Sequence, residues 1–279
     1  MNRQKRIIAI NDISCFGKCS LTAAIPILSA AGIETCVLPT AVLSSHTGFS
    51  GYTFRDLTDD LLTEAEHWKS LGLTFDGIYT GYLASKRQVS CVEKIMELFP
   101  SEFVLVDPVM GDNGRLYDGF DESFAKEMKR LLQKADIIVP NVTEAAFLTD
   151  VPFESGTHSQ DYIETMIEKL KPVCRGQIVL TGIHSGPQKV GTAVWDGVQL
   201  KIIENEKIDV FYSGTGDVFA SALAAAVMLG KDTKKAAEIA AGYVIDCILE
   251  TRKTSGDRSY GVNFELCTKE LLAALGLLS

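Results

Sequence analysis

The sequence predicts an α/β fold in which a mostly parallel central sheet has helices on both faces and an antiparallel hairpin at one edge. Short apolar runs bounded by Asp, Pro or Gly alternate with longer amphipathic stretches, the pattern of alternating strands and helices. The short runs are rich in Ile, Val and Leu, as in parallel strands buried on both faces. Later, "VGTAVWDGVQLKII" contains two alternating runs that meet at Asp196-Gly197, a two-residue hairpin signal.

The individual elements follow from this pattern in chain order. The predicted strands are Ile7–Ile10, Thr35–Leu38, Gly77–Tyr79, Phe103–Val106, Ile137–Val139 and Ile178–Leu180. The predicted helices before the hairpin are Leu21–Ala31, Leu57–Leu71, Arg87–Leu98, Phe124–Gln133 and Asp161–Leu170. Three further helices end the chain: Thr215–Leu229, Thr233–Leu249 and Phe264–Leu275.

Length and composition indicate one domain over residues 1–279, with a large core because 46% of the 279 residues are hydrophobic. The net charge of −9 argues against a surface for nucleic acid or an anionic membrane, since both need clustered Lys and Arg. The seven cysteines have no paired or zinc-type spacing, which suggests reduced thiols and a cytoplasmic protein. The longest apolar stretch, Val218–Leu229, is shorter than the roughly 20 residues of a membrane span.

Polar residues directly after the predicted strands are the first candidates for a site. Ligands of open α/β sheets bind outside the carboxyl ends of the strands, so these residues should converge on one rim. Each of them, taken alone, is equally consistent with an ordinary turn or N-cap residue. The candidates are Asn11, Asp12, Asp107, Asn141, Glu144 and Thr181.

The segment "SGTGD" (213–217) places a carboxylate at the start of a strongly apolar helix. Gly214 and Gly216 let the backbone turn tightly and leave amide N–H groups unshielded where the helix dipole favours an anion. Asp217 lies in the same first turn, so it can accept a hydroxyl proton while the amides stabilise a transferring phosphoryl group. The sequence therefore indicates phosphoryl transfer at this turn.

A bare Gly-Thr-Gly-Asp match is also consistent with a tight turn before an acidic helix start. The sequence lacks the competing motifs, however: "FGKCS" has neither the upstream Gly of a P-loop nor its Ser or Thr after Lys18. It also contains no His-Arg-Asp kinase loop, no G-x-S-x-G elbow and no H-E-x-x-H zinc motif. Phosphoryl transfer by another class of kinase remains the favoured interpretation.

Three motifs together, "SGTGD", "PNVTE" and "DPVMGDNG", resemble those of ribokinase-superfamily kinases, and the likeness runs along the whole chain. "LSSHTGFSGY" (43–52) and "TGYLAS" (80–85) are similar to the vitamin-binding segments of pyridoxal/pyridoxamine kinases. The resemblance implies a ribokinase-like three-layer sandwich. It also implies an ATP-dependent kinase that phosphorylates the 5′-hydroxymethyl group of the B6 vitamers pyridoxal, pyridoxamine and pyridoxine.

The same resemblance assigns the catalytic roles. Asp217 matches the general base, and Gly214, Thr215 and Gly216 match the anion hole. The loop 112–119, "DNGRLYDG", is similar to the flap that closes over the reacting groups, and its glycines and polarity suit a mobile segment. Alternatively, this stretch is only a surface loop.

The resemblance also implies which residues bind the nucleotide and its metal ion. Asn141 and Glu144 match the N-x-x-E pair that organises Mg²⁺ and its waters around the ATP phosphates. Asp107 matches an acidic residue near the phosphates and metal, and Thr181 a nucleotide contact. Carboxylate and amide groups acting through water suit Mg²⁺, which keeps much of its hydration shell. A monovalent cation such as K⁺ is a further expectation from the resemblance, with no residue assigned to it.

On the vitamer side, His46, Thr47 and Tyr82 match positions around the pyridine ring. Asp12 departs from the pattern, since many pyridoxal kinases have Ser after the first strand. A negative charge there would favour a protonated ring nitrogen or a cationic vitamer, so we expect pyridoxamine or pyridoxine to be used at least as well as pyridoxal. The alternative is that Asp12 caps the helix near Leu21 or forms a turn.

Three functions stay open. The favoured one is a B6 vitamer kinase, the second a hydroxymethylpyrimidine or sugar kinase of the same fold, and the third a non-catalytic nucleotide- or vitamer-binding protein. An intact Asp217 argues against the third, because a binding protein needs no base. We expect the partners to be the small-molecule substrate and ATP, and the resemblance suggests a homodimer.

Overall fold

The structure is a computed structural model that describes residues 3–254 and 260–278. The chain divides into two compact units, one made of residues 1–103 and 210–279 and the other of residues 104–209. Each unit is built around its own run of hydrogen-bonded strands.

The sheet of unit 1 has the strand order β4-β1-β2-β3. β1 (Arg6–Ser14) pairs in parallel with β2 (Glu34–Leu43) and β4 (Gly77–Thr80), and β3 (Phe54–Asp56) pairs antiparallel with β2. The central position of β1 explains its apolar sequence, because its side chains are covered on both faces of the sheet. The fully buried ones are Ile7, Ile8 and Ile10.

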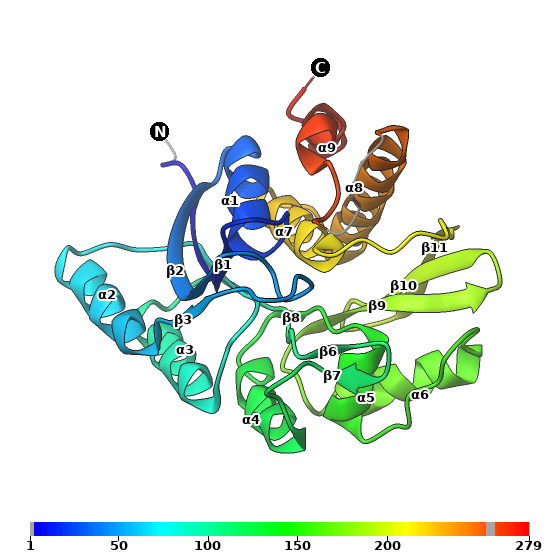
Figure 1. The fold of residues 1–279 in the computed structure, drawn as a ribbon, viewed down its shortest axis with the longest axis horizontal. Helices are drawn as coiled ribbons and strands as arrows, with labels where there is room; N and C mark the ends of the chain where they lie inside the picture. Colours follow the sequence, from blue (N-terminus) through cyan, green and yellow to red (C-terminus); the bar gives the residue numbers. More distant parts are fainter. Residues whose placement is uncertain (1–2, 255–259, 279) are drawn as a thin grey trace. The chain divides into compact units, whose positions relative to one another are not determined.

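Helices cover both faces of these strands (Figure 1). α1 (Ser20–Ala30) packs on β1 and β2, while α2 (Thr58–Ser70) packs on β2 and against α3 (Lys86–Leu98). Figure 1 shows α1 on one side of the strands and α2 with α3 on the other. Unit 1 therefore has the helix-sheet-helix layering that the sequence predicts.

The last segment of the chain completes unit 1. α7 (Thr215–Met228) packs against α1 and α8 (Thr233–Lys253), and the turn η1 (Phe264–Cys267) leads into α9 (Thr268–Leu275). Every side chain of α7 from residue 218 to residue 226 is buried. Its many alanines allow neighbouring helices to approach closely, so the first turn of α7 has a rigid mount.

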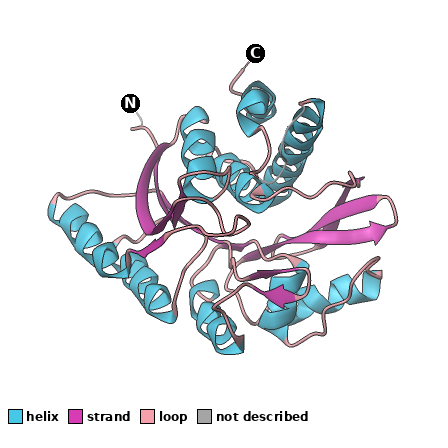
Figure 2. Cartoon of the chain, viewed as in Figure 1, coloured by secondary structure: helices cyan, strands magenta, loops and turns pink. Residues whose placement is uncertain are grey.

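The strands of unit 2 follow the order β5-β8-β9-β10-β11. Figure 2 shows strands in magenta and helices in cyan. β5 (Phe103–Val106), β8 (Ile137–Ile138) and β9 (Gln177–Gly186) are parallel, and β10 (Lys189–Trp195) and β11 (Leu200–Glu206) continue antiparallel from β9. The predicted fold class, a mostly parallel sheet with helices and an antiparallel hairpin, is confirmed.

The turn of this hairpin is longer than the sequence predicts. Trp195 pairs with Leu200, so the loop contains residues 196–199 rather than the two residues Asp196-Gly197. Asp196 Oδ1 accepts hydrogen bonds from the backbone N–H groups of Val198 and Gln199, each at 2.9 Å. The aspartate side chain closes the longer loop, an alternative to the two-residue turn that Asp-Gly also favours.

Three helices lie along one side of the unit 2 strands: α4 (Glu122–Leu132), α5 (Val142–Thr149) and α6 (Gln160–Leu170). Every predicted helix and strand overlaps one in the structure, but α5 was not predicted, and neither was β3. α5 is only 8 residues long, too short to show a clear helical period.

A small ribbon of β6 (Gly111–Asp112) and β7 (Arg115–Leu116) occupies the loop predicted as a flap. Asn113 and Gly114 connect the two strands with positive φ angles of 51° and 75°. These angles are typical of a type I′ turn, and Asn-Gly is its most frequent sequence. The Asn-Gly dipeptide is therefore a signal from which this hairpin could have been predicted.

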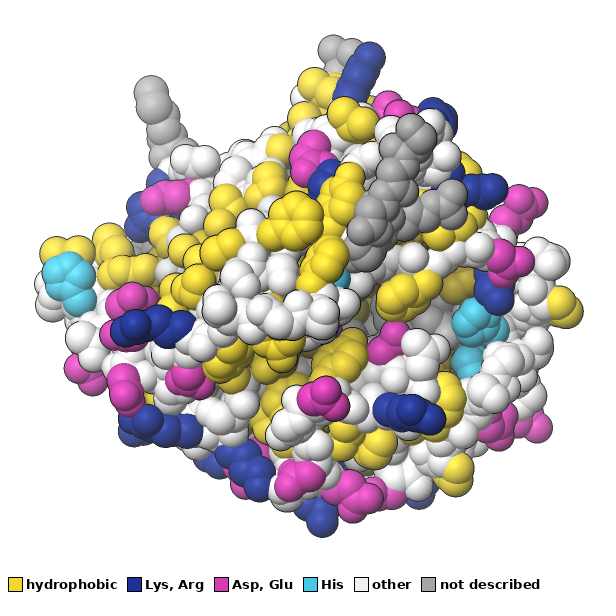
Figure 3. Space-filling view, in the orientation of Figure 1, with side chains coloured by type: hydrophobic (Ala, Val, Ile, Leu, Met, Phe, Trp, Pro, Cys, Tyr) yellow, Lys and Arg dark blue, Asp and Glu magenta, His cyan; other side chains and the backbone are white. Residues whose placement is uncertain are grey.

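Acidic and basic side chains are interspersed over the face of the molecule shown in Figure 3. Many of them form exposed ion pairs, such as Arg3 with Asp76 at 2.9 Å and Arg130 with Glu127 at 2.7 Å. Pairs of this kind contribute at most about 1 kcal/mol each. Among the described residues, none of the helices combines the length and apolar character needed to cross a membrane.

Candidate active site

The turn at the start of α7 depends on Gly214. This residue has a φ of +78°, which L side chains rarely adopt, and a Cβ on it would lie 2.1 Å from the carbonyl oxygen of Lys18. Gly216 has open space around it, and no side chain caps α7. The Thr215 hydroxyl donates back to the Tyr212 carbonyl at 3.4 Å. The first amides of α7 are thus uncovered by side chains, as an anion hole requires.

Asp217 lies in this first turn, half-buried, between β1 and the start of α1. Asn11 Nδ2 donates to Asp217 Oδ1 at 3.3 Å, and the Ser20 backbone N–H donates to the same carboxylate. Burial raises the pKa of Asp217 to about 6, with a contribution from the nearby Asp12, while the two donors act in the opposite direction. A carboxylate with this pKa is ionised at neutral pH and still accepts a proton readily, as a general base must.

Asn11 connects Asp217 to the backbone of Asp12 and Tyr82 through hydrogen bonds. The sequence did not predict this role. Asn11 was only one of several polar residues near the end of a strand, but it is 1% exposed and all its side-chain polar groups are used. Its Oδ1 accepts from the backbone N–H groups of Asp12 (2.9 Å) and Tyr82 (2.8 Å). A Cβ at Gly81 would lie 2.2 Å from Asn11 Nδ2, so the glycine of "TGYLAS" makes room for this amide.

Asp12 lies inside β1 rather than after it, at the point where one residue of β1 faces two of β2. Its carboxylate accepts from the hydroxyls of Ser14 (2.9 Å) and Ser20 (2.5 Å), and burial raises its pKa. The alternative that Asp12 caps a helix is wrong, because the N-cap of α1 is Cys19 and makes no side-chain cap hydrogen bond. A register shift of this kind commonly re-aims a side chain near a site.

The segments predicted to surround the pyridine ring also lie in unit 1. His46 is buried between Gly17 and Gly48, where its Nδ1 accepts from the Gly48 backbone N–H at 3.0 Å. Thr47 is exposed on the same loop. Tyr82 is half-buried, and burial together with the charge of Asp12 raises its pKa to about 12. The structure thus groups Tyr82 with Asp12 and Asp217 and leaves Thr47 at the surface of the neighbouring loop.

In unit 2, Asn141 and Glu144 form a capping box at the start of α5. Asn141 Oδ1 accepts from the Glu144 backbone N–H at 2.9 Å, and Glu144 Oε2 accepts from the Asn141 backbone N–H at 2.8 Å. Glu144 Oε1 accepts from Met110, and Asn141 Nδ2 donates to Gly111. Burial raises the pKa of Glu144, and the backbone N–H groups of Asn141 and Met110 act in the opposite direction. The N-x-x-E motif therefore has a structural role as a helix cap, and the role predicted for it around Mg²⁺ stays a prediction.

Two further predicted residues lie nearby in the fold of unit 2. Asp107 is buried directly after β5, and Thr181 is paired with Asn141 in an isolated parallel bridge. Thr181 was predicted to follow its strand, but β9 continues to Gly186, so it lies within the strand. Burial raises the pKa of Asp112 in the adjacent ribbon. The unit thus gathers carboxylate groups around the ends of β5 and β8.

These carboxylates are suitable for Mg²⁺ held through water. The described residues include no group of three or more His, Cys, Asp and Glu side chains arranged around one metal position. Both oxygens of Glu144 already accept backbone hydrogen bonds, from Asn141 and Met110. Because Mg²⁺ prefers oxygen ligands and retains several waters, Asp107, Asn141 and Glu144 fit a role in orienting those waters.

The comparisons with known proteins identify the family. The sequence model of the phosphomethylpyrimidine kinase family matches residues 19–262. The chain belongs to this family. It is also 28% identical over 278 residues to a Schizosaccharomyces pombe protein provisionally named a pyridoxal kinase, an alignment that covers 90% of this chain and 87% of that protein.

Solved structures of the family's relatives agree over nearly the whole chain. A Bacteroides thetaiotaomicron protein, provisionally named a phosphomethylpyrimidine kinase and solved with pyridoxal, is 36% identical, with a TM-score of 0.91 and coverage of 96% of each chain. Pyridoxal kinase from Lactobacillus plantarum is 29% identical, with a TM-score of 0.89 and coverage of 98% of each chain. The predicted resemblance to pyridoxal kinases and the ribokinase-like fold are confirmed.

The raised pKa of Asp217 predicts an effect on stability. The folded protein holds this proton more tightly than the unfolded chain, from an ordinary pKa of 3.8 to about 6, so stability is lost as pH rises through this window. Asp217→Asn should therefore raise Tm by about 2 to 6 °C near pH 7.5 and by much less near pH 4.5.

Differential scanning fluorimetry at the two pH values measures this difference. Asp232→Asn is the matched control, because Asp232 is an exposed N-cap and Asn caps equally well. An equal gain in Tm at both pH values would show that ionisation of Asp217 is not its cause.

Proposed function

We propose that this protein is an ATP-dependent kinase that phosphorylates the 5′-hydroxymethyl group of B6 vitamers. The observation that carries the proposal is the placement of Asp217 in the uncapped first turn of a buried helix, next to Asn11 and Asp12. Support for the vitamer comes from the relatives, because several are named pyridoxal kinases and one was solved with pyridoxal.

In this reaction Asp217 accepts the proton of the vitamer hydroxyl as its oxygen attacks the γ-phosphorus. The new O–P bond forms as the bond between the γ-phosphorus and the bridging oxygen of ADP breaks, and the proton stays on the carboxylate. Asn11 and the Ser20 N–H fix the orientation of Asp217. The amides of Thr215 and Gly216 stabilise the charge on the transferring group.

Residues of unit 2 bind the nucleotide in this proposal. ATP supplies the phosphoryl group, and Mg²⁺, when bound, would screen the charge of the triphosphate. Asn141 and Glu144 would orient water around the metal, Asp107 would add a carboxylate at the end of β5, and Thr181 would contact the nucleotide. The acidic composition of the chain makes such screening necessary, because carboxylates alone would repel a triphosphate.

The second candidate is phosphorylation of hydroxymethylpyrimidine. The observation that favours it is the family match itself, since the family takes its name from phosphomethylpyrimidine. Both substrates present a hydroxymethyl group on a nitrogen heterocycle, so the same base and anion hole serve either one. The homodimer, the cytoplasmic location and the use of K⁺ stay predictions.

A substrate panel tests the proposal directly. Turnover is measured with Mg·ATP and pyridoxal, pyridoxamine, pyridoxine, hydroxymethylpyrimidine or ribose, for wild type and Asp217→Asn. We expect phosphorylation of the B6 vitamers and a loss of about 10²- to 10⁴-fold in kcat for the variant, with nucleotide binding close to normal.

Each other result has a distinct meaning. Activity on the pyrimidine or ribose alone would retain the fold and base but replace the substrate. A variant with near-wild-type kcat would show that Asp217 is not the base. No turnover on any compound would favour a non-catalytic binding protein.

The two roles of Asn141 can be separated with a second N-cap in unit 2. Ser159 Oγ accepts from the Tyr162 backbone N–H at 3.1 Å, as Asn141 does from Glu144 at 2.9 Å. Asn141→Ala and Ser159→Ala should each lower stability by about 1 kcal/mol. Only Asn141→Ala should raise KM for Mg·ATP, by about 10-fold or more, in steady-state kinetics. Equal kinetics in the two variants would leave Asn141 with the capping role alone.

Asp12 is tested by vitamer preference. Because Asp12→Ser removes a negative charge near the ring, kcat/KM should shift toward pyridoxal relative to pyridoxamine and pyridoxine. Asp12→Asn is the matched variant that removes the charge and keeps an acceptor oxygen for one of the two hydroxyls, Ser14 or Ser20, while its NH2 group faces the other. The ratio between vitamers is the measurement, since either change also affects Asp217 for all substrates. An unchanged order of preference would contradict a role in vitamer choice.

A further inference from the structure

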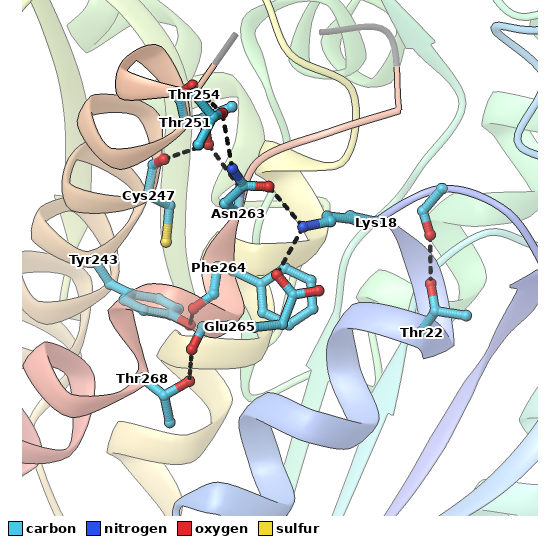
Figure 4. A network of polar contacts seen from close by, with 11 residues as sticks. Lys18, Thr22, Tyr243, Cys247, Thr251, Thr254, Asn263, Phe264, Glu265 and Thr268 are labelled. Carbon is cyan, nitrogen blue, oxygen red and sulfur yellow. Dashed lines mark hydrogen bonds and ion pairs between the residues drawn. The ribbon is translucent and has the colours of Figure 1, made fainter. Parts of the chain in front are cut away.

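Lys18, in the loop between β1 and α1, joins the C-terminal segment to the start of α7. Its Nζ donates to Asn263 Oδ1 and pairs with Glu265 Oε2, each at 2.8 Å (Figure 4). The same ammonium lies 5.7 Å from the ring centre of Tyr260 and 5.9 Å from that of Phe264. The side chain of Lys18 is 20% exposed and that of Glu265 is 51% exposed, so the ion pair alone contributes little, and the confinement of Lys18 comes from the combination with Asn263 and the two rings.

The backbone of Lys18 is equally confined. Its N–H donates to the Tyr260 carbonyl at 2.8 Å. Its carbonyl oxygen would lie 2.1 Å from a Cβ at Gly214 and 3.2 Å from a Cβ at Gly261. The backbone of Lys18 therefore lies between Gly214, in the proposed anion-binding turn, and Tyr260 and Gly261 of the C-terminal segment. Because the Lys18 carbonyl is so close to Gly214, no side chain fits at that position.

Ser20, two residues after Lys18, contacts the proposed base Asp217 through its backbone. Ser20 has a φ of +50°, which is strained for a residue with a side chain. In this conformation its N–H donates to Asp217 and its hydroxyl donates to Asp12 at 2.5 Å. Such a conformation persists only where surrounding contacts fix it. The contacts of Lys18, two residues earlier, are one set of them, and the hydrogen bond from the Ser20 hydroxyl to Asp12 is another.

Asn263, which accepts the hydrogen bond from Lys18, is itself bonded to residues at the end of α8. The backbone N–H of Asn263 donates to Thr251 Oγ1 at 2.7 Å, and its Nδ2 donates to Thr254 Oγ1 at 3.2 Å. Tyr243 Oη donates to the Phe264 carbonyl at 2.9 Å. Figure 4 shows these contacts as one continuous network from the end of α8 to Lys18. A rigid helix thus holds the residues that hold Lys18.

We propose that Lys18 is a positioning residue for Asp217, acting through the backbone of residues 18–20. The proposal rests on Asp217 being the general base. Lys18 itself contacts no reacting group in this assignment. Its role is to keep the Ser20 N–H directed at the carboxylate, so that Asp217 is ionised and correctly oriented in the substrate complex.

Lys18→Met keeps the aliphatic length and removes the ammonium. We expect kcat to fall about 10-fold with KM for the vitamer and for Mg·ATP changed by less than about 2-fold, since geometry at the base is lost while binding groups remain. Lys18→Arg keeps a donor for both Asn263 and Glu265 and should restore most of the rate.

The pH profile distinguishes positioning from simple stabilisation. The titratable groups that face Asp217 are Asp12 from β1 and the Cys19 thiol at the start of α1; Asn11 and Ser20 are neutral donors. A weaker Ser20 hydrogen bond disfavours the carboxylate, so the acidic limb of kcat should move up by about half a unit or more in Lys18→Met. The ¹³C chemical shift of the Asp217 carboxyl, followed by NMR, gives the same titration without any turnover.

Lys235→Met is the matched control, since it removes an exposed ammonium paired with Glu238 at 3.4 Å on α8. It should leave kcat, the acidic limb and the NMR titration unchanged. A Lys18→Met variant with wild-type kcat and an unmoved Asp217 titration would overturn the proposal, whatever its Tm. If wild type were inactive on every substrate, the proposed function would fail, and the NMR titration would still decide whether Lys18 positions Asp217.

Discussion

The carboxylate of Asp217 is held at the first turn of a buried helix by neutral donors, with another carboxylate as its near neighbour. Asn11 and the Ser20 N–H are the donors, and Asp12 is the neighbour. Burial and like charge raise the proton affinity of Asp217, and the donors limit the rise. Asn11 and Asp12 come from β1, Ser20 from the start of α1 and Asp217 from α7, so this arrangement depends on the relative positions of three elements.

The two units divide the chemistry between them. Unit 1 holds the proposed base, the uncapped helix turn and the segments predicted to meet the vitamer, while unit 2 holds the carboxylates and the capping box that we propose for the nucleotide. The contrast in how the carboxylates are satisfied is informative. Both oxygens of Glu144 accept hydrogen bonds from backbone N–H groups, whereas Asp217 accepts one from the Asn11 side chain and one from the Ser20 backbone, so the two carboxyl groups differ in the kind of donor.

The sequence predicted the class of fold because the central strands are apolar throughout and the hairpin alternates. It also predicted that Asp217 lies in the first turn of an apolar helix after two glycines, and the structure places it there. The anion hole and the base at this turn stay predictions. The roles of Asn11 and Ser20 could not be predicted, because they depend on contacts between residues about 200 positions apart and on a strained backbone that leaves no pattern in the sequence. Thr181 and Asp12 were placed after their strands because apolar runs do not show how far hydrogen bonding continues.

The capping box at Asn141 and Glu144 should affect which residues of this family are retained in evolution. If selection for catalysis were relaxed in a descendant, the pair would still be retained, because it starts α5 and satisfies backbone groups at Met110 and Gly111. Asp217 has the opposite balance, since an ionised, half-buried carboxylate with a raised pKa destabilises the fold at neutral pH. Under the proposed function, drift would therefore remove Asp217 before the N-x-x-E pair, so a relative that keeps the motif without the acid would have inherited the fold without the activity.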